Sequence, residues 1–230
     1  MLTICTFNIQ NDIRNYNISK SNEIIDFLKK NEIDVLNLQE VYSLIDKDLS
    51  KELNNLSYTI IGTYRFYLKR LFNRINERTP IITNKNIIEY KTYHLPFLPS
   101  LLKRVMTKVV IEYEGKKISI YNTHLDYKYD LVKKRQLNKI LNIIKNDNNS
   151  IILTGDFNLK NNKIIFNEFI DELNKLKIKH IDVKDKTLKQ SNYHRAIDHI
   201  FLSDSFDVIS YERITNLDIS DHYPIILKIK

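Results

Sequence analysis

The chain has 230 residues, of which 43% are hydrophobic, and this is most economically one domain over residues 1–230 with a sizeable core. Its single cysteine excludes an intrachain disulfide, and no stretch approaches the roughly 18 apolar residues of a membrane span. The start, MLTICTFNIQ, lacks the pattern of a signal peptide, so we expect a cytoplasmic protein with no obligate protein partner. The net charge of +8 favours a partner that carries phosphate.

The first part of the chain alternates predicted strands and helices. Residues 2–9 are apolar or small on both faces, as in a buried strand, and Ser21 or Asn22 can cap the helix that follows. In order, we expect a strand at 2–9, a helix after residue 21, a strand at 33–40, a helix at 42–54, a strand at 57–61, and a surface loop or irregular helix at 62–78.

The rest of the chain adds a clear hairpin, because two alternating strands within residues 105–125 flank a turn that contains Gly115. In order, we expect strands at 79–83 and 91–95, a loop at 96–104, the hairpin, a helix at 130–146, a strand at 151–159 that breaks at Gly155, a helix at 163–176, and strands at 196–203 and 223–230. Hairpin connections mixed with helical ones favour mixed sheets covered by helices.

Polar side chains gather at the ends of these predicted strands or in the loops beside them. They are Asn8, Glu40, His124, Asp156 with Asn158, Asp198, and Asp221 with His222. Each alone has an ordinary explanation, such as a turn residue, a solvated strand end or a partly buried histidine. Together they offer oxygen ligands for a hard cation such as Mg²⁺, and a histidine and aspartates that could orient or deprotonate a water. This combination is typical of phosphate-ester hydrolysis.

In chain order, the segments "FN", "LQE", "NTHLD", "GDFN", "IDHIF" and "SDH" resemble the endonuclease/exonuclease/phosphatase superfamily, which includes deoxyribonuclease I, exonuclease III and the sphingomyelinases. The resemblance extends from Asn8 to His222. It implies an α+β fold, a four-layer α/β/β/α sandwich of two mixed β-sheets flanked by helices, with the active site at one edge of the sheets. It also implies a metal-dependent phosphoesterase that uses Mg²⁺, which Mn²⁺ could replace.

The resemblance also implies a set of metal ligands in this chain. Glu40 corresponds to the principal ligand of the family. Asn8 and Asp221 would lie beside it or at a second metal position. One ion or two are both compatible with this set.

Catalytic roles carry over in the same way. His222 resembles the catalytic histidine, and Asp198 the aspartate that fixes its tautomer through a hydrogen bond. Asp156 and Asn158 would position the water and the phosphate, and His124 would contact the scissile phosphate.

Two further residues allow two interpretations each. Glu77, in "NERTPII", matches a family glutamate that supports the first histidine, here His124, but it could equally be a surface charge. Arg135 follows the "THLD" segment and could reach substrate, although a basic helix face exposed to water explains it as well.

The motifs predict the reaction class better than the substrate. The compact length favours a phosphatase or phosphodiesterase that acts on a small phosphorylated metabolite, nucleotide or inositol phosphate. The alternative is a DNA or RNA nuclease, for which the basic and aromatic stretch at 64–74 could follow a nucleic-acid backbone. A sphingomyelinase-type lipid hydrolase would need a membrane-docking loop, for which 93–102 is the apolar candidate. A protein-binding scaffold is disfavoured because the metal and histidine positions are all retained.

Overall fold

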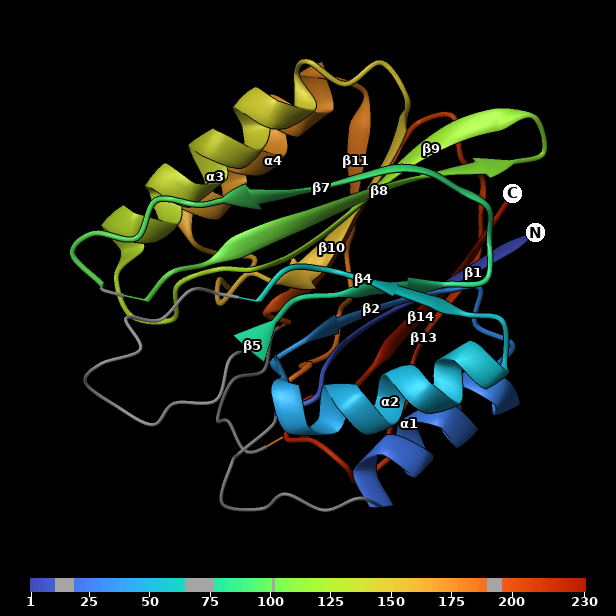
Figure 1. The fold of residues 1–230 in the computed structure, drawn as a ribbon. Helices are drawn as coiled ribbons and strands as arrows, with labels where there is room; N and C mark the ends of the chain where they lie inside the picture. The colour runs from blue at the N-terminus through green and yellow to red at the C-terminus, as the bar shows by residue number, and fades with distance from the viewer. Residues whose placement is uncertain (11–18, 65–76, 101, 190–195) are drawn as a thin grey trace.

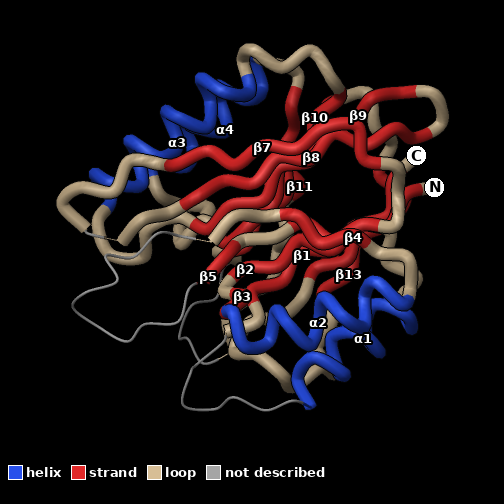
Figure 2. The backbone as a smooth tube through the Cα atoms, in the orientation of Figure 1, coloured by secondary structure: helices blue, strands red, loops and turns tan. Residues whose placement is uncertain are grey.

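The structure is a computed structural model in which residues 1–10, 19–64, 77–100, 102–189 and 196–230 are described. Two β-sheets face each other, and a pair of helices covers the outer face of each sheet (Figure 1, Figure 2). This arrangement confirms the predicted four-layer sandwich of two mixed sheets.

The first sheet is built from both ends of the chain. It consists, in spatial order, of β13 (Val208–Arg213), β14 (Ile225–Ile229), β1 (Leu2–Asn8), β2 (Val35–Gln39), β6 (Ile81–Thr83) and β4 (Thr59–Ile61). β1 and β2 run parallel, whereas the other neighbours are antiparallel. β14 therefore lies inside the sheet, between β1 and β13.

The second sheet comes from the middle of the chain. It consists, in spatial order, of β11 (Ile178–Ile181), β12 (Asp198–Ser203), β10 (Ser150–Asp156), β9 (Lys116–His124), β8 (Val105–Tyr113) and β7 (Ile87–His94). Only β9 and β10 pair in parallel among these described strands. A small antiparallel pair, β3 (Val41–Tyr42) and β5 (Glu77–Arg78), stands beside the two sheets.

Four helices cover the sheets within the described residues: α1 (Ser19–Lys30), α2 (Ser43–Asn55), α3 (Asp130–Ile144) and α4 (Ile164–Lys175). α1 and α2 lie on the first sheet, and α3 and α4 on the second (Figure 1). Each buries a stripe of apolar residues spaced three or four apart, as Ile45, Leu49 and Leu53 show for α2. No helix in the described part of the chain is long and apolar enough to cross a membrane.

Strand alternation explains why the core has three layers. Along β1, Leu2 and Ile4 face the cluster between the two sheets, whereas Cys5 and Phe7 face the cluster under α1 and α2. The third cluster lies between the second sheet and the helices α3 and α4. Both faces of the central strands are therefore apolar, as the sequence indicates for residues 2–9.

The layer between the sheets becomes polar toward the carboxyl ends of β1, β2, β9 and β10. Asn37 Nδ2 donates to Thr154 Oγ1 at 2.8 Å, and Gln39 Nε2 donates to Asn122 Oδ1 at 2.7 Å. Asn122 Nδ2 donates in turn to the carbonyl oxygens of Leu38 and Pro80. These side chains are fully buried. If one sheet shifted on the other, their hydrogen bonds would break and the buried polar groups would have no partners. They fix how the sheets lie on each other.

Several sequence-based boundaries need correction. β10 does not break at Gly155 but continues through it to Asp156, paired with β9 and β12. β11 and β13 were not predicted, and residues Glu77–Arg78 form β5 rather than loop or helix. The predicted strand at 79–83 is shortened to β6, and the one at 91–95 is part of the longer β7.

Candidate active site

Sheet register brings the predicted site residues to one edge of the sandwich. Asn8, the last residue of β1, pairs with Gln39 at the end of β2, and Glu40 follows directly. Asp156, the last residue of β10, pairs with His124 on one side and Asp198 on the other. This edge lies at the end of β1 opposite the chain termini (Figure 1).

Asn8 connects the two sheets at this edge. Its Nδ2 donates to Glu40 Oε1 at 3.3 Å and to Asp156 Oδ2 at 3.0 Å. Its Oδ1 accepts from the backbone N–H of Gln10 at 2.9 Å. The amide nitrogen, and not the oxygen, thus faces the carboxylates. That Asn8 binds a metal directly stays a prediction.

His222 and Asp198 form a buried pair. His222 Nδ1 lies 2.9 Å from Asp198 Oδ2, so the ring carries a proton on Nδ1 and directs Nε2 toward the site. Burial alone would lower the pKa of His222, but the charge and hydrogen bond of Asp198, with Asp156 and Asp221 nearby, raise it to about 10. Ser220 fixes the backbone here, because its Oγ donates to the carbonyl of Asn8 and accepts from the N–H of His222.

Asp156 lies at the centre of the cluster. Its Oδ2 is 3.5 Å from His124 Nε2 and 3.9 Å from His222 Nε2, so both histidine rings direct the same nitrogen toward it. Burial raises the pKa of Asp156 to about 7; the charge of Asp198 adds to this shift, and His222 opposes it. A strongly perturbed carboxyl between two histidines is typical of an active site.

Glu40 and Asp221 have the chemistry of a cation site. Asp221 Oδ1 is buried and has no hydrogen-bond donor among the described residues. Burial raises the pKa of Asp221; His222 opposes this shift, and the negative charge of Glu40 adds to it. Glu40 itself has a positive φ of 59°, which turns the chain directly after β2. Asp221 Oδ1 is 3.9 Å from His222 Nε2. A buried carboxylate oxygen that accepts no hydrogen bond, beside a second carboxylate, fits a hard divalent cation.

A second grouping of possible ligands overlaps this site. Ligand atoms of Asp156, Asp198 and His222 all lie within 4.8 Å of one another. Asp198 Oδ2 is hydrogen-bonded to His222 Nδ1, so this grouping would use His222 Nε2 and the Oδ1 atom of Asp198. Glu40 and Asp221 offer oxygen ligands alone, which suit a hard cation better than a set that includes a histidine.

The "GDFN" segment owes its shape to two unusual backbone positions. A Cβ on Gly155, which has a φ of 149°, would lie 2.0 Å from the carbonyl oxygen of Thr123, so only glycine allows β9 and β10 to approach here. Asn158 has a φ of 51°, and its N–H donates to Asp156 Oδ1. The Asn158 side chain donates to the carbonyl of Leu125 at 3.2 Å and so holds the loop rather than pointing at Asp156.

His124 has a different environment from the one expected. Glu77 Oε1 is 3.8 Å from His124 Nδ1, beyond hydrogen-bond distance, although Glu77 is buried and is not a surface charge. The group that reaches Nδ1 is the Nη1 atom of Arg104, at 2.9 Å. Sequence reasoning missed Arg104 because it stands at the end of a segment that looks like a loop.

Two other candidates do not join the cluster in this structure. Arg135 is on α3, where its Nη1 donates to the carbonyl of Leu98 at 3.3 Å in an exposed contact. Most of the basic and aromatic stretch, from Arg65 to Arg74, lies outside the described residues. Tyr64, which is described, donates to Asp46. Within the apolar segment at 93–102, Leu95 is buried, whereas Leu98 is exposed.

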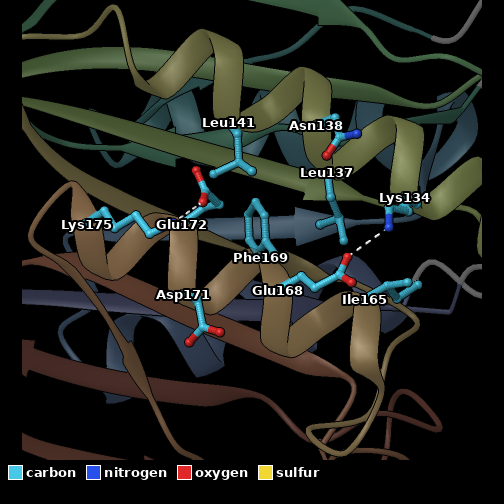
Figure 3. A pocket seen from close by; sticks show the side chains of 10 residues that line it. All are labelled: Lys134, Leu137, Asn138, Leu141, Ile165, Glu168, Phe169, Asp171, Glu172 and Lys175. Carbon is cyan, nitrogen blue, oxygen red and sulfur yellow. Dashed lines mark hydrogen bonds and ion pairs between the residues drawn. The ribbon is translucent and has the colours of Figure 1, made fainter.

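A groove between α3 and α4 lies on the outer face of the second sheet (Figure 3). Leu137, Leu141 and Phe169 form its floor, and an ion pair between Lys134 and Glu168 crosses it at 2.9 Å. None of the predicted site residues lines it. It is the surface groove where α3 packs on α4, and it is separate from the candidate active site.

Comparison with solved structures shows the same fold. The mannosyl-6-phosphatase of Bacteroides thetaiotaomicron is 20% identical with a TM-score of 0.82, and the match covers 100% of both chains. An endonuclease/exonuclease/phosphatase from Bacteroides vulgatus is 23% identical with a TM-score of 0.83 over 100% of this chain and 98% of that one. D. rerio TDP2, complexed with a single-strand DNA product, is 17% identical with a TM-score of 0.75 over 100% and 98%.

A search of curated proteins gives no match. The sequence model of the endonuclease/exonuclease/phosphatase family matches residues 5–222, nearly the whole chain and every residue of the cluster at the sheet edge. With the two-sheet fold and the site at its edge, this match shows that the chain belongs to the endonuclease/exonuclease/phosphatase family.

Proposed function

We propose that this protein is a Mg²⁺-dependent phosphoesterase that hydrolyses mono- or diesters of a small phosphorylated molecule by attack of water. The observation that carries the proposal is the convergence of His124 Nε2 and His222 Nε2 on Asp156, at 3.5 and 3.9 Å. Two nitrogen atoms at this spacing can both contact one phosphoryl group.

His222, held by Asp198, is the group that exchanges a proton or hydrogen bond with the attacking water or the phosphate. Asp156 orients that water, because its carboxylate lies between the histidines and is fixed by Asn8. His124 contacts the phosphoryl oxygen. Asn158 contributes through the loop, since its backbone N–H holds Asp156 Oδ1.

Glu40 and Asp221 would hold the metal ion, with Asn8 beside them. When bound, Mg²⁺ supplies charge neutralisation of the phosphate and stabilisation of the departing oxygen. Mn²⁺ offers the same coordination by oxygen ligands and should replace it. The buried Oδ1 of Asp221, which accepts no hydrogen bond from the described residues, supports this assignment.

A small phosphorylated substrate is favoured over nucleic acid on two grounds. The mannosyl-6-phosphatase is more similar in structure, with a TM-score of 0.82, than TDP2, with a TM-score of 0.75. The described cluster also holds no residues arranged to read base edges. The match to TDP2 with a DNA product supports the alternative of a nuclease, which the experiment below therefore also tests.

The first experiment measures phosphate release from a panel of sugar phosphates, nucleotides and inositol phosphates, in parallel with nicking of supercoiled plasmid. Each assay is run with Mg²⁺, with Mn²⁺ and with EDTA. We expect phosphate release that needs the metal, and intact plasmid. Nicking without release from small esters would make the protein a nuclease.

Variants link the activity to the site. His222→Ala and Glu40→Gln should each lower kcat/KM by at least about 100-fold, as is typical when a general acid–base group or a metal ligand is lost. His94→Ala and Glu23→Gln are matched controls, since both residues are exposed and lie outside the site. Activity that survives the first pair of changes would show that the reaction takes place elsewhere or belongs to a contaminant.

A further inference from the structure

Arg104 is a buried arginine next to the site, with a relative exposure of 5%. It directly precedes β8, and its carbonyl accepts from the N–H of Leu95, which closes the loop between β7 and β8. This backbone contact holds the start of the side chain in place. Its guanidinium reaches the ring of His124, with Nη1 2.9 Å from Nδ1.

The chemistry of the two groups determines where the proton of His124 lies. A guanidinium has five N–H donors and no acceptor, so Nδ1 of His124 has to accept. An imidazole that accepts at Nδ1 is neutral and carries its proton on Nε2. The donor of His124 is therefore directed at Asp156 Oδ2, at 3.5 Å, and Glu40 Oε1, at 3.9 Å.

Glu77 takes part as the counter-charge of the arginine. Its Oε1 lies 3.7 Å from Arg104 Nη1, and the side chains of Glu77 and Arg104 are 4% and 6% exposed. A buried guanidinium is costly unless an opposite charge lies close to it. Glu77 Oε1 is also 3.8 Å from His124 Nδ1, so the three atoms form a triangle in which only the distance between Arg104 Nη1 and His124 Nδ1 is a hydrogen-bond distance.

The two site histidines are consequently held in opposite ways. His222 Nδ1 faces the carboxylate of Asp198, which favours a proton on that nitrogen. His124 Nδ1 lies at 2.9 Å from a guanidinium that can only donate, whereas the carboxylate of Glu77 is 3.8 Å away, beyond hydrogen-bond distance. Both rings direct Nε2 at Asp156.

We propose that Arg104 is a positioning residue which, by donating to Nδ1, fixes His124 as the Nε2–H tautomer and so makes it a permanent hydrogen-bond donor to the phosphoryl oxygen. This rests on the proposed phosphoesterase function for the identity of the acceptor. The tautomer itself does not depend on that function. Glu77 supplies the counter-charge of Arg104.

The test reads the tautomer directly. In protein labelled with ¹⁵N-histidine, two-bond ¹H–¹⁵N spectra distinguish the protonated ring nitrogen from the unprotonated one, and His124→Gln assigns the resonances. We expect wild type to show His124 protonated on Nε2 only. A proton on Nδ1 in wild type would overturn the proposal without any variant.

Three variants test the cause. Arg104→Met removes the donors while keeping much of the side-chain volume, so the Nδ1–H form should appear and kcat should fall about 10- to 100-fold, the usual effect of losing a partner that orients a ligand residue. Arg104→Lys retains a donor and should restore part of the Nε2–H signal. Arg78→Met is the control, because it also removes a buried arginine, but one that pairs with Asp46.

The outcomes separate the two proposals. An unchanged His124 tautomer in folded Arg104→Met overturns the role of Arg104, whatever the activity. If Arg104→Met does not fold, the wild-type spectrum decides alone, because a proton on His124 Nδ1 there overturns the role. If wild type hydrolyses no phosphate ester, the proposed function fails, while the spectra still decide the tautomer.

Discussion

A buried pair of histidines, His180 in β11 and His199 in β12, makes the stability of the fold sensitive to mild acid. His199 Nε2 donates to the carbonyl of Leu159 at 2.7 Å, so its Nδ1 accepts from His180 Nε2 at 3.1 Å. Phe166 and Phe201 pack against both rings. Neither ring can take a second proton without losing a hydrogen bond or placing charge among aromatic side chains.

Burial lowers the pKa of His199 to about 3 and that of His180 to about 4. Unfolded histidine titrates near 6.5, so below that pH the unfolded chain binds protons that the folded protein excludes. The stability from these residues is present above pH 6.5 and is lost as the pH falls. At pH 5 the loss is about 2 kcal/mol for each histidine, or about 4 kcal/mol for both, since each pH unit is worth about 1.4 kcal/mol.

The measurement is urea unfolding followed by far-UV circular dichroism, because the sequence has no tryptophan to report by fluorescence. Wild type is compared with His180→Gln/His199→Gln at pH 7.5 and pH 5. The comparison cancels the titration of the active-site carboxyls and of His222, which both proteins share. We expect wild type to lose about 4 kcal/mol relative to the variant between these pH values. If the difference in unfolding free energy between wild type and variant is the same at pH 7.5 and pH 5, the two histidines are not held neutral and the reasoning is refuted.

Three further predictions concern packing and the metal. Gly155→Ala should lower the free energy of unfolding by more than about 4 kcal/mol or prevent folding, since its Cβ would meet Thr123. Gly115→Ala, with no atom within 4 Å of its Cβ, should cost only the ~1–2 kcal/mol of its positive φ. Urea unfolding compares the two variants. Phe201→Ala should cost about 3–5 kcal/mol in the same assay, and a loss below ~1 kcal/mol would contradict its central place among the aromatic rings. Mg²⁺ at 100 times its Kd should stabilise the protein by about 2.7 kcal/mol and raise Tm by roughly 5–10 °C, and Glu40→Gln should abolish the shift while Glu23→Gln keeps it.

The sequence predicted the architecture well where patterns were local. The hairpin of β8 and β9 and the helix α3 follow from alternation and from apolar spacing, and both are confirmed within a few residues. β13 was missed because Val208–Arg213 is exposed along nearly its whole length, so it shows no buried face. Its place in the sheet is set by pairing with β14, which a local pattern cannot reveal.

The candidate site shows the same limit. Motif order predicted which residues are relevant, and the register of β1 with β2 and of β9 with β10 explains why they are close. Arg104 could not be found this way, since a single arginine after an apolar loop looks like a surface charge. Its one sequence signal is its place at the start of the first hairpin strand, beside the strand that ends in His124.

The position of β14 inside the first sheet has a consequence for how the protein is made. In a growing chain β1 is the first and β14 the last of the described strands to emerge from the ribosome, although the two strands pair from Leu2 with Ile229 to Thr6 with Ile225. Until then β1 keeps one open edge, which is a surface prone to pairing with other chains. Asp221 and His222 arrive on the same late segment. The insertion of this one strand therefore both closes the open edge of β1 and brings Asp221 and His222 to the candidate site.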